Sequence, residues 1–252
     1  MVMGVVEQRV DTAQEAGLTG ARVLITGLRS RHGVEIARAF AEQGCRLVLQ
    51  TPEMNSDLQV VLELIAADAE EVHLSETPIT DDATALKLAQ WSAGVCGGLD
   101  VVINLARLDD TGLGAGADAR AIEDRITAAL SAPFRITQVI ANRMQLTWKE
   151  GLILNIVTQG PVATPAAAHL GAIARAALAS ITRQEARRWA GSSVRVNAVV
   201  PAGEHANESG CAPDAFETGL ASEGEIAELA VHLASGKGRD ISGLTFDAAL
   251  VS

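Results

Sequence analysis

Two parts of the sequence carry residue types that could hold a substrate or a cofactor. The loop TGLRSRHG (26–33) joins an apolar run to a helical pattern, and its glycines could let backbone N–H groups approach a phosphate. Thr158 ends another apolar run, where its hydroxyl could hydrogen-bond a carbonyl oxygen. Arg175 follows on a helical pattern and supplies a positive charge, but a guanidinium does not give up its proton.

Residue types that the chain lacks restrict this chemistry further. The chain contains no tyrosine, so no mechanism in it can use a phenol as proton donor. Arginine carries nearly all of the positive charge, because the only lysines are Lys87, Lys149 and Lys237. Any mechanism that needs a tyrosine is therefore excluded, and arginine cannot give up its proton.

The cysteines and histidines show no pattern of a cross-link or a metal site. Cys45, Cys96 and Cys211 lie far apart, form no CxxC pair and are odd in number, so we expect buried thiols in a reducing cytoplasm. The five histidines show neither an HExxH motif nor another ligand spacing. No metal site is predicted.

Composition and charge indicate a folded globular protein and exclude two kinds of partner. Of the 252 residues, 48% are hydrophobic and 20% are charged, which is typical of a domain with an ample core. The net charge of −11 would repel nucleic acid. No apolar run approaches the roughly 18 residues of a membrane span, and the apolar opening meets Glu7 too soon for a signal peptide.

Short apolar runs alternate with helical patterns along the chain. Strands are predicted at 21–26, 45–50, 71–74, 100–106, 151–158, 193–200 and 243–248. Helices are predicted at 32–44, 55–69, 81–94, 118–147, 165–190 and 223–236. This alternation predicts a doubly wound parallel sheet covered on both faces, in a single domain over 18–252 after an N-terminal arm at 1–17. The segment 201–219 is predicted to be a loose loop.

Several segments, taken in order, resemble the short-chain dehydrogenase/reductase family. They are TGLRSRHG (26–33), INLA (103–106), PFRITQVIANRM (133–144), LILNIVTQG (152–160), VRVNAVVPAG (194–203), EIAELAVHLAS (225–235) and SGLTFDAA (242–249). The resemblance covers about residues 18–248. It implies a Rossmann-like α/β fold, a nicotinamide cofactor and ketone reduction. It also implies a dimer contact through the helices at 118–147 and 165–190.

The catalytic positions that this resemblance implies are not filled by the family's residues. Thr158 stands at the serine position, Gly171 at the tyrosine position, Arg175 at the lysine position and Ala129 at the asparagine position. Loss of a positioned proton donor costs about 10²–10⁴ in rate. His169 lies two residues before Gly171, so a helix would direct it to another face. We therefore predict that these catalytic positions are degenerate.

The implied cofactor site departs from the family as well. Only Gly27 and Gly33 remain in the loop, and Arg31 stands where a glycine would let the backbone approach the pyrophosphate. Arg107 replaces the glycine after the fourth strand, and Thr51 replaces the acid that binds ribose hydroxyls in NAD-dependent members. These changes predict that the chain itself holds no dinucleotide.

The arginines of the loop leave two other interpretations open. Arg29 and Arg31, without an acid at Thr51, would suit the 2′-phosphate of NADP. Alternatively, the arginines fill an empty cleft and pair with Asp109, with Asp110 or with a carboxylate of a partner subunit.

The main hypothesis is a catalytically inactive, structural subunit of a hetero-oligomeric short-chain dehydrogenase. An active paralogue would supply the tyrosine, the lysine and NAD(P), in a cytoplasmic heterotetramer joined through helices 118–147 and 165–190. In its losses the chain resembles the inactive partner in the two-subunit hydroxyacyl-CoA-type dehydrogenase of anaerobic toluene degradation. Two alternatives remain: a stand-alone homo-oligomeric binding or sensor protein, and a divergent active reductase.

Overall fold

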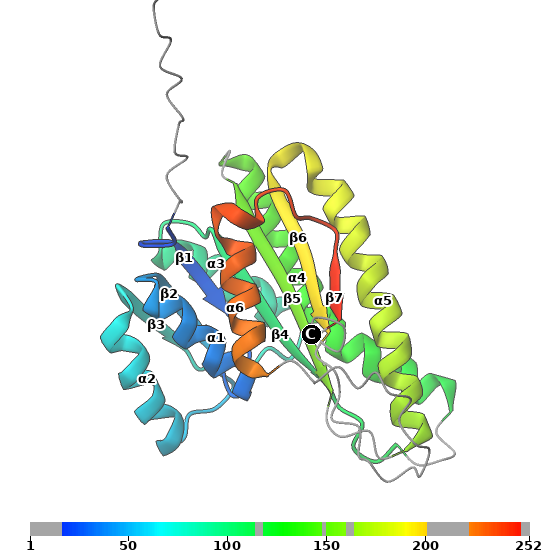
Figure 1. Cartoon of the computed structure of the whole chain (residues 1–252). Coiled ribbons are helices and arrows are strands. Elements are labelled where there is room, and N and C mark those ends of the chain that lie inside the picture. Colours follow the sequence, from blue (N-terminus) through cyan, green and yellow to red (C-terminus); the bar gives the residue numbers. More distant parts are fainter. Residues whose placement is uncertain (1–16, 114–117, 148–149, 160–163, 201–221, 248–252) are drawn as a thin grey trace, which may run out of the picture.

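The described strands form one seven-stranded parallel sheet (Figure 1). The computed structural model describes residues 17–113, 118–147, 150–159, 164–200 and 222–247. The strands are β1 (Arg22–Ile25), β2 (Arg46–Gln50), β3 (Glu71–Ser75), β4 (Val101–Leu108), β5 (Gly151–Gln159), β6 (Val194–Val200) and β7 (Thr245–Asp247). Their order is β3-β2-β1-β4-β5-β6-β7, so the strand order reverses between β1 and β4. Ligands of open parallel sheets bind at such a reversal, outside the carboxyl ends of the strands.

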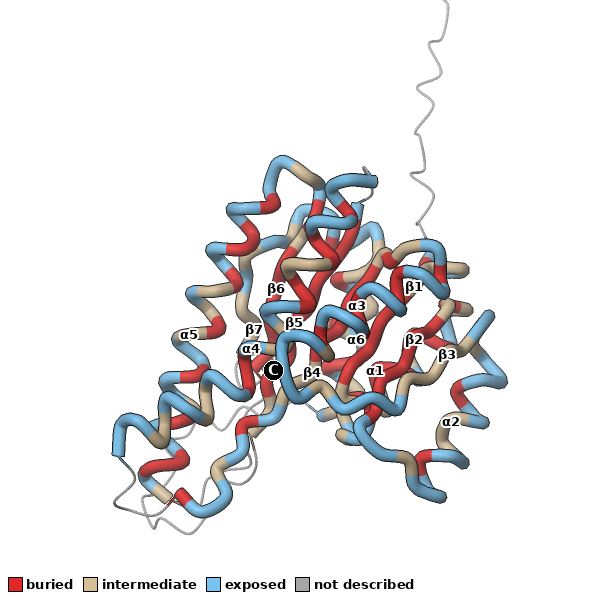
Figure 2. The backbone as a smooth tube through the Cα atoms, turned by 180° about the vertical axis from the view of Figure 1, so that it is seen from behind, coloured by how far each residue is buried: buried red, intermediate tan, exposed pale blue. Residues whose placement is uncertain are grey.

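Helices cover both faces of the sheet (Figure 2). They are α1 (Arg31–Glu42), α2 (Ser56–Asp68), α3 (Asp82–Val95), α4 (Ala119–Leu146), α5 (Pro165–Trp189) and α6 (Glu223–Ala234), with short 3₁₀ helices at Ala190–Ser192 and Gly236–Gly238. Buried residues of α1, α2 and α6 pack in one cluster, and those of α3 and α4 pack in another. The predicted single Rossmann-like α/β domain is confirmed.

The central strands are apolar on both sides because each side meets a helix layer. In β1, Val23 and Ile25 pack toward α1 and α6, whereas Leu24 between them packs toward α3 and α4. All three are fully buried. The continuous apolar runs of the sequence therefore reflect a sheet that is buried on both faces.

Each α-helix starts at a polar side chain that accepts a hydrogen bond from a backbone N–H in the first turn. These N-caps are Ser30, Asn55, Asp81, Asp118, Thr164 and Ser222. Such caps satisfy backbone donors that have no partner within the helix. Local sequence thus fixes where the helices begin, including α5, which has Pro165 in its first turn.

Most predicted boundaries agree with the structure to within one or two residues. The fourth strand is longer than predicted, because Arg107 and Leu108 of β4 stay in register with Thr158 and Gln159 of β5. The predicted arm at 1–17, except for Gly17, and the predicted loop at 201–219 lie outside the described residues. Within the described part of the chain, no helix is long and apolar enough to cross a bilayer.

Candidate active site

The two glycines of the loop after β1 are required by the backbone. Gly27 has a φ of +71°, and a Cβ on it would lie 2.8 Å from the carbonyl oxygen of Leu105 in β4. A Cβ on Gly33 would lie 2.8 Å from the carbonyl oxygen of Gly27. Glycine at both positions lets the chain turn sharply and brings α1 close to the strand.

Gln50 at the end of β2 holds this turn from the other side. Its side chain is buried, its Oε1 accepts a hydrogen bond of 3.0 Å from the N–H of Gly27, and its Nε2 donates one of 2.9 Å to the carbonyl of Thr77. Gln50 is not among the site residues that were predicted from the sequence. Its only signal is a polar residue at the end of an apolar strand.

The N-terminus of α1 follows directly after the loop. Ser30 caps the helix by accepting a 2.9 Å hydrogen bond from the N–H of Gly33. Arg31 is exposed on the first turn, and the exposed Arg29 pairs with Glu53 at 3.2 Å. Burial lowers the pKa of the half-buried His32, against an opposing effect of Glu223, and so favours its neutral form. The partial positive charge of the helix end and two arginines therefore border the loop.

A cleft of about 240 Å³ lies between the loop, the end of β4 and the middle of α4. Gly27, Leu105 and Ala129 line it, as does the exposed Arg107, whereas Arg31 is not among its lining residues. The cleft lies at the reversal of strand order.

Two other positions of the implied cofactor site have partners of their own. Thr51 is fully buried, and its hydroxyl donates a 2.8 Å hydrogen bond to the carbonyl of Glu53. Asp109 pairs with Arg125 rather than with an arginine of the loop. Hydrogen bonds from Thr111, and then the charge of Arg125, hold the pKa of Asp109 below its usual value.

A buried polar cluster fixes the middle of β4 and of β5 against α4. Asn104 Nδ2 donates to Asn155 Oδ1 at 2.9 Å, and the Thr137 hydroxyl donates to the same oxygen at 3.3 Å. All three side chains are at least 95% buried. They hold β5, which contains Thr158, beside α4, which contains Ala129.

Thr158 lies on β5 and Gly171 lies on the neighbouring helix α5. The side chain of Gln159 takes up the space next to Gly171. The Thr158 hydroxyl donates a 3.3 Å hydrogen bond to the carbonyl of Ala106. Gln159 Oε1 lies too close to the point where a Cβ of residue 171 would stand for both atoms to fit, and Gln159 Nε2 donates a 2.7 Å hydrogen bond to the carbonyl of Ala167. The amide of Gln159 thus fills the space beside Gly171.

The remaining candidate residues, Arg175 and His169, lie on α5, and Arg175 lines a small pocket together with Gly171 and Gln159. Arg175, one turn after Gly171, is exposed, and so is His169. Among the described residues, no group of three histidine, cysteine or acidic side chains could hold a metal ion.

Comparison with known proteins indicates an enzyme family. Residues 21–208 match the short chain dehydrogenase family model. Galactitol 2-dehydrogenase (L-tagatose-forming) of Cereibacter sphaeroides is 30% identical over 242 residues, which are 90% of this chain and 92% of that protein. The 3-oxoacyl-[acyl-carrier-protein] reductase FabG of Staphylococcus aureus is 24% identical over 232 residues, which are 88% of this chain and 94% of that protein.

A solved structure shows the same fold with a cofactor. The short chain dehydrogenase from Burkholderia cenocepacia J2315, in complex with NADP, superposes with a TM-score of 0.74. It is 22% identical, and the match covers 92% of this chain and 97% of that one.

These relatives contradict the prediction of a non-catalytic structural subunit and of a protein that is not an enzyme. They are named as dehydrogenases and reductases, and none is named as a structural subunit. The prediction that this chain holds no dinucleotide gains no support from them, nor does the similarity to an enzyme of toluene degradation. The loss of the family's catalytic side chains at Gly171 and Arg175 is therefore not evidence that the chain lacks activity.

Proposed function

Because the chain belongs to the short-chain dehydrogenase family, we propose that it is a nicotinamide-dependent oxidoreductase that interconverts a secondary alcohol and a ketone. The observation that carries this proposal is the turn after β1. Gly27 approaches the backbone of Leu105 so closely that no other residue fits, and the turn leads directly into the N-terminus of α1. That geometry suits the diphosphate of a dinucleotide.

The residues around the loop fit such a cofactor. The backbone of 27–33 would hold the diphosphate, and the cleft beside Ala129 would take the adenosine. Arg29 and Arg31 border the loop and Thr51 offers no carboxylate, so we propose a preference for NADP over NAD. When bound, the nicotinamide supplies or accepts the hydride.

The residues that we propose to contact the substrate oxygen differ from those of the family pattern. The Thr158 hydroxyl would donate a hydrogen bond to the carbonyl oxygen, exchanging its present bond to Ala106. Arg175 adds positive charge one turn after Gly171, which favours a developing alkoxide, but it stays protonated. We infer that the proton reaches this oxygen from water. Turnover is therefore expected to be slower by about 10²–10⁴ than with a positioned acid.

We also propose that α4 and α5 form the contact between subunits. Phe134 on α4 and Ile173 on α5 are 36% and 49% exposed, and Ala172 and Ala176 would permit close approach of a second helix. A second copy of this chain and an active paralogue, as predicted from the sequence, are the two candidates for the other side.

The test is turnover by the purified chain with substitutions at Thr158. NADPH and NADH are each supplied with a panel of ketones, and the oxidised cofactors with secondary alcohols that include galactitol. Thr158→Val removes the hydroxyl at constant size and should lower kcat/KM at least about tenfold, whereas Thr158→Ser keeps the hydroxyl and should retain most of the activity. Equal activity in both variants would contradict the role of Thr158. Dinucleotide binding without any turnover would favour the sensor alternative.

A further inference from the structure

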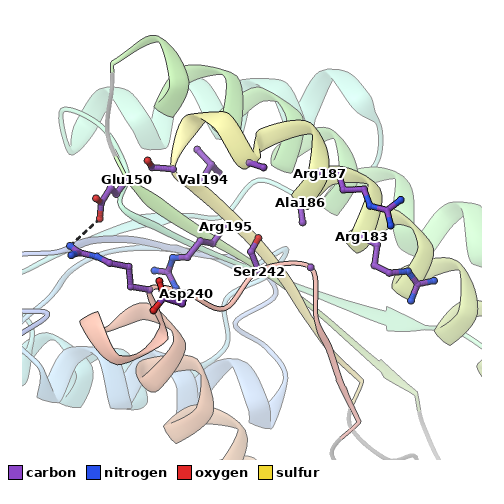
Figure 3. Close-up of a pocket in the computed structure, with 12 residues that line it drawn as sticks. Glu150, Arg183, Ala186, Arg187, Val194, Arg195, Asp240 and Ser242 are labelled. Carbon is purple, nitrogen blue, oxygen red and sulfur yellow. Dashed lines mark ion pairs between the residues drawn. The ribbon is translucent and has the colours of Figure 1, made fainter.

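A second pocket lies at the opposite edge of the sheet from the candidate active site. It has a volume of about 580 Å³ and is bordered by the last turns of α5, the start of β6 and the turn before β7 (Figure 3). Ser193 and Glu150, which line it, directly precede β6 and β5. The pocket is therefore at the amino ends of these strands, whereas the cleft beside Gly27 is at the carboxyl ends of β1 and β4.

The lining of this pocket carries an excess of positive charge. Four of its residues are arginines and two are acids, namely Arg183, Arg187, Arg195, Arg239, Glu150 and Asp240. The local balance is thus four positive charges against two negative ones, in a chain whose net charge is −11. Such a local concentration in an acidic protein draws anions toward one place on the surface.

Arg183 and Arg187 stand four residues apart on α5, so their like charges lie one above the other and repel. Both are exposed, and neither forms an ion pair with any residue that the structure describes. The partial negative charge of the helix end acts within the last turn, so it reaches Arg187 but not Arg183. Arg188, by contrast, lies beside the buried Glu185 at 3.8 Å and over the ring of Trp189.

Arg195 is held rigidly in the middle of the pocket (Figure 3). Its Nη1 donates hydrogen bonds of 2.6 Å to the carbonyls of Leu233 and Gly238. Burial lowers its pKa, and the nearby Arg239 lowers it further, against the opposing effects of Glu150 and Asp240. Arg239 forms an ion pair with Glu150, which also lines the pocket, at 3.2 Å. The fixed guanidinium loses little freedom when a ligand arrives.

We propose that this pocket binds a small molecule that carries at least two negative charges as phosphate or carboxylate groups. Guanidinium groups recognise both through paired hydrogen bonds, and the pocket has the volume of a small-ligand site. One anionic group would lie at Arg195. The exposed side chains of Arg183 and Arg187, which point away from Arg195 in Figure 3, would turn toward a second anionic group, and this would relieve their repulsion. Ser193 and Ser242 add hydroxyls to the lining. This site is separate from the proposed oxidoreductase site and does not depend on it.

The test is isothermal titration of the full chain with inorganic pyrophosphate and with citrate at low ionic strength. Arg183→Gln combined with Arg187→Gln should weaken binding about a hundredfold, roughly tenfold for each arginine removed. Arg120→Gln is the matched control, because Arg120 is also exposed but starts α4 at the other end of the molecule. Tighter binding of pyrophosphate would identify phosphate groups as the ligand class, and tighter binding of citrate would identify carboxylates.

Two results would overturn the proposal. The first is no measurable binding of either probe to the unaltered chain. The second is binding that survives in the double variant, especially if Arg31→Gln abolishes it, because the probe would then occupy the loop before α1. Arg183 and Arg187 are exposed, so the double variant should fold, and thermal unfolding checks that it does.

Discussion

The side chain of Gln159 lies against Gly171, and its Oε1 is too close to the point where a Cβ at position 171 would be for both atoms to fit. Gln159 ends β5 and Gly171 lies in the second turn of α5, so the contact joins the sheet to the helix. The hydrogen bond from Gln159 to the carbonyl of Ala167 holds the amide there. A side chain at 171 and the present position of Gln159 are therefore mutually exclusive.

This exclusion predicts that a tyrosine becomes functional only when Gln159 is removed. Gly171→Tyr alone must displace the amide and break its hydrogen bond to Ala167, at a cost of about 0.5–1.5 kcal/mol in stability. Gly171→Tyr with Gln159→Ala leaves room for the phenol beside Thr158. Relative to Gln159→Ala alone, the double variant should raise kcat by about 10²–10⁴ in ketone reduction. Unchanged kcat would show that a proton donor at 171 does not limit this chain.

The close approach of Gly27 to β4 predicts that replacing Gly27 lowers the unfolding free energy by more than its positive φ alone would. Gly27→Ala places a methyl group 2.8 Å from the carbonyl oxygen of Leu105, at a φ of +71°. Gly97→Ala is the matched control, since Gly97 has a φ of +67° but open space around it. The control should lose about 1 kcal/mol of unfolding free energy, and Gly27→Ala should lose at least about 1 kcal/mol more. Urea unfolding measures both.

Gly27→Ala should also abolish NADPH binding, whereas Gly97→Ala should retain it. Fluorescence titration with NADPH compares the two variants. If Gly27→Ala and Gly97→Ala had similar unfolding free energies and similar affinities for NADPH, the turn would not depend on the close approach of Gly27 to β4.

Burial of Cys45 predicts a loss of stability in alkali. Burial, and to a smaller extent the charge of Asp100, raises the pKa of the Cys45 thiol to about 12. In the unfolded chain a thiol has a pKa near 8.5. As the pH rises, ionisation of Cys45 therefore stabilises the unfolded state before the folded thiol can ionise. The contribution of Cys45 is therefore complete below about pH 8.5 and declines as the pH rises toward about 12, by up to about 1.4 kcal/mol per pH unit.

Urea unfolding of the unaltered chain and of Cys45→Ala over this pH range isolates the thiol. Effects of other groups are common to both proteins and cancel in the difference. The stability difference between them should shrink as the pH rises. Parallel pH profiles would show that Cys45 ionises alike in the folded and unfolded chains.

The proposed contact through α4 and α5 predicts which substitutions disturb assembly. Ala176→Trp should weaken association by about 1–3 kcal/mol, because a bulky side chain separates helices that approach closely. Ala67→Trp on α2, also an exposed alanine on a helix, should leave the mass unchanged. Native mass spectrometry of the chain alone and with an active paralogue gives the oligomeric state. Identical distributions for both variants would place the contact elsewhere.

The sequence predicts the fold well because its signals are local. Apolar runs mark strands that are buried on both faces, and capping side chains such as Ser30 and Thr164 mark the helix starts. The extra residues of β4 could not be predicted in this way. Arg107 is charged, so it interrupts the apolar pattern from which the strand was predicted. It belongs to β4 because it pairs with Thr158 of the neighbouring strand β5.

The candidate site was predicted only in part, because its decisive contacts join residues far apart in sequence. The positions of Thr158 and Gly171 follow from spacing along β5 and α5. The amides of Gln50 and Gln159 do not, since each depends on how a strand end packs against a different element. Counting lost residue types also gave a wrong functional conclusion, since the relatives that match most of the chain are named as a dehydrogenase and a reductase.

The central claim is that this chain transfers hydride between a nicotinamide cofactor and a substrate without a tyrosine. The most direct measurement uses NADPH fully deuterated at C4, the purified chain and a panel of ketones, with mass spectrometry of the alcohol products. We predict an alcohol that carries deuterium on its carbinol carbon, formed slowly, and formed less by Thr158→Val than by Thr158→Ser. No deuterated alcohol from any ketone, with an assay sensitive to a rate about 10⁴ below a typical turnover of about 10 per second, would contradict the claim.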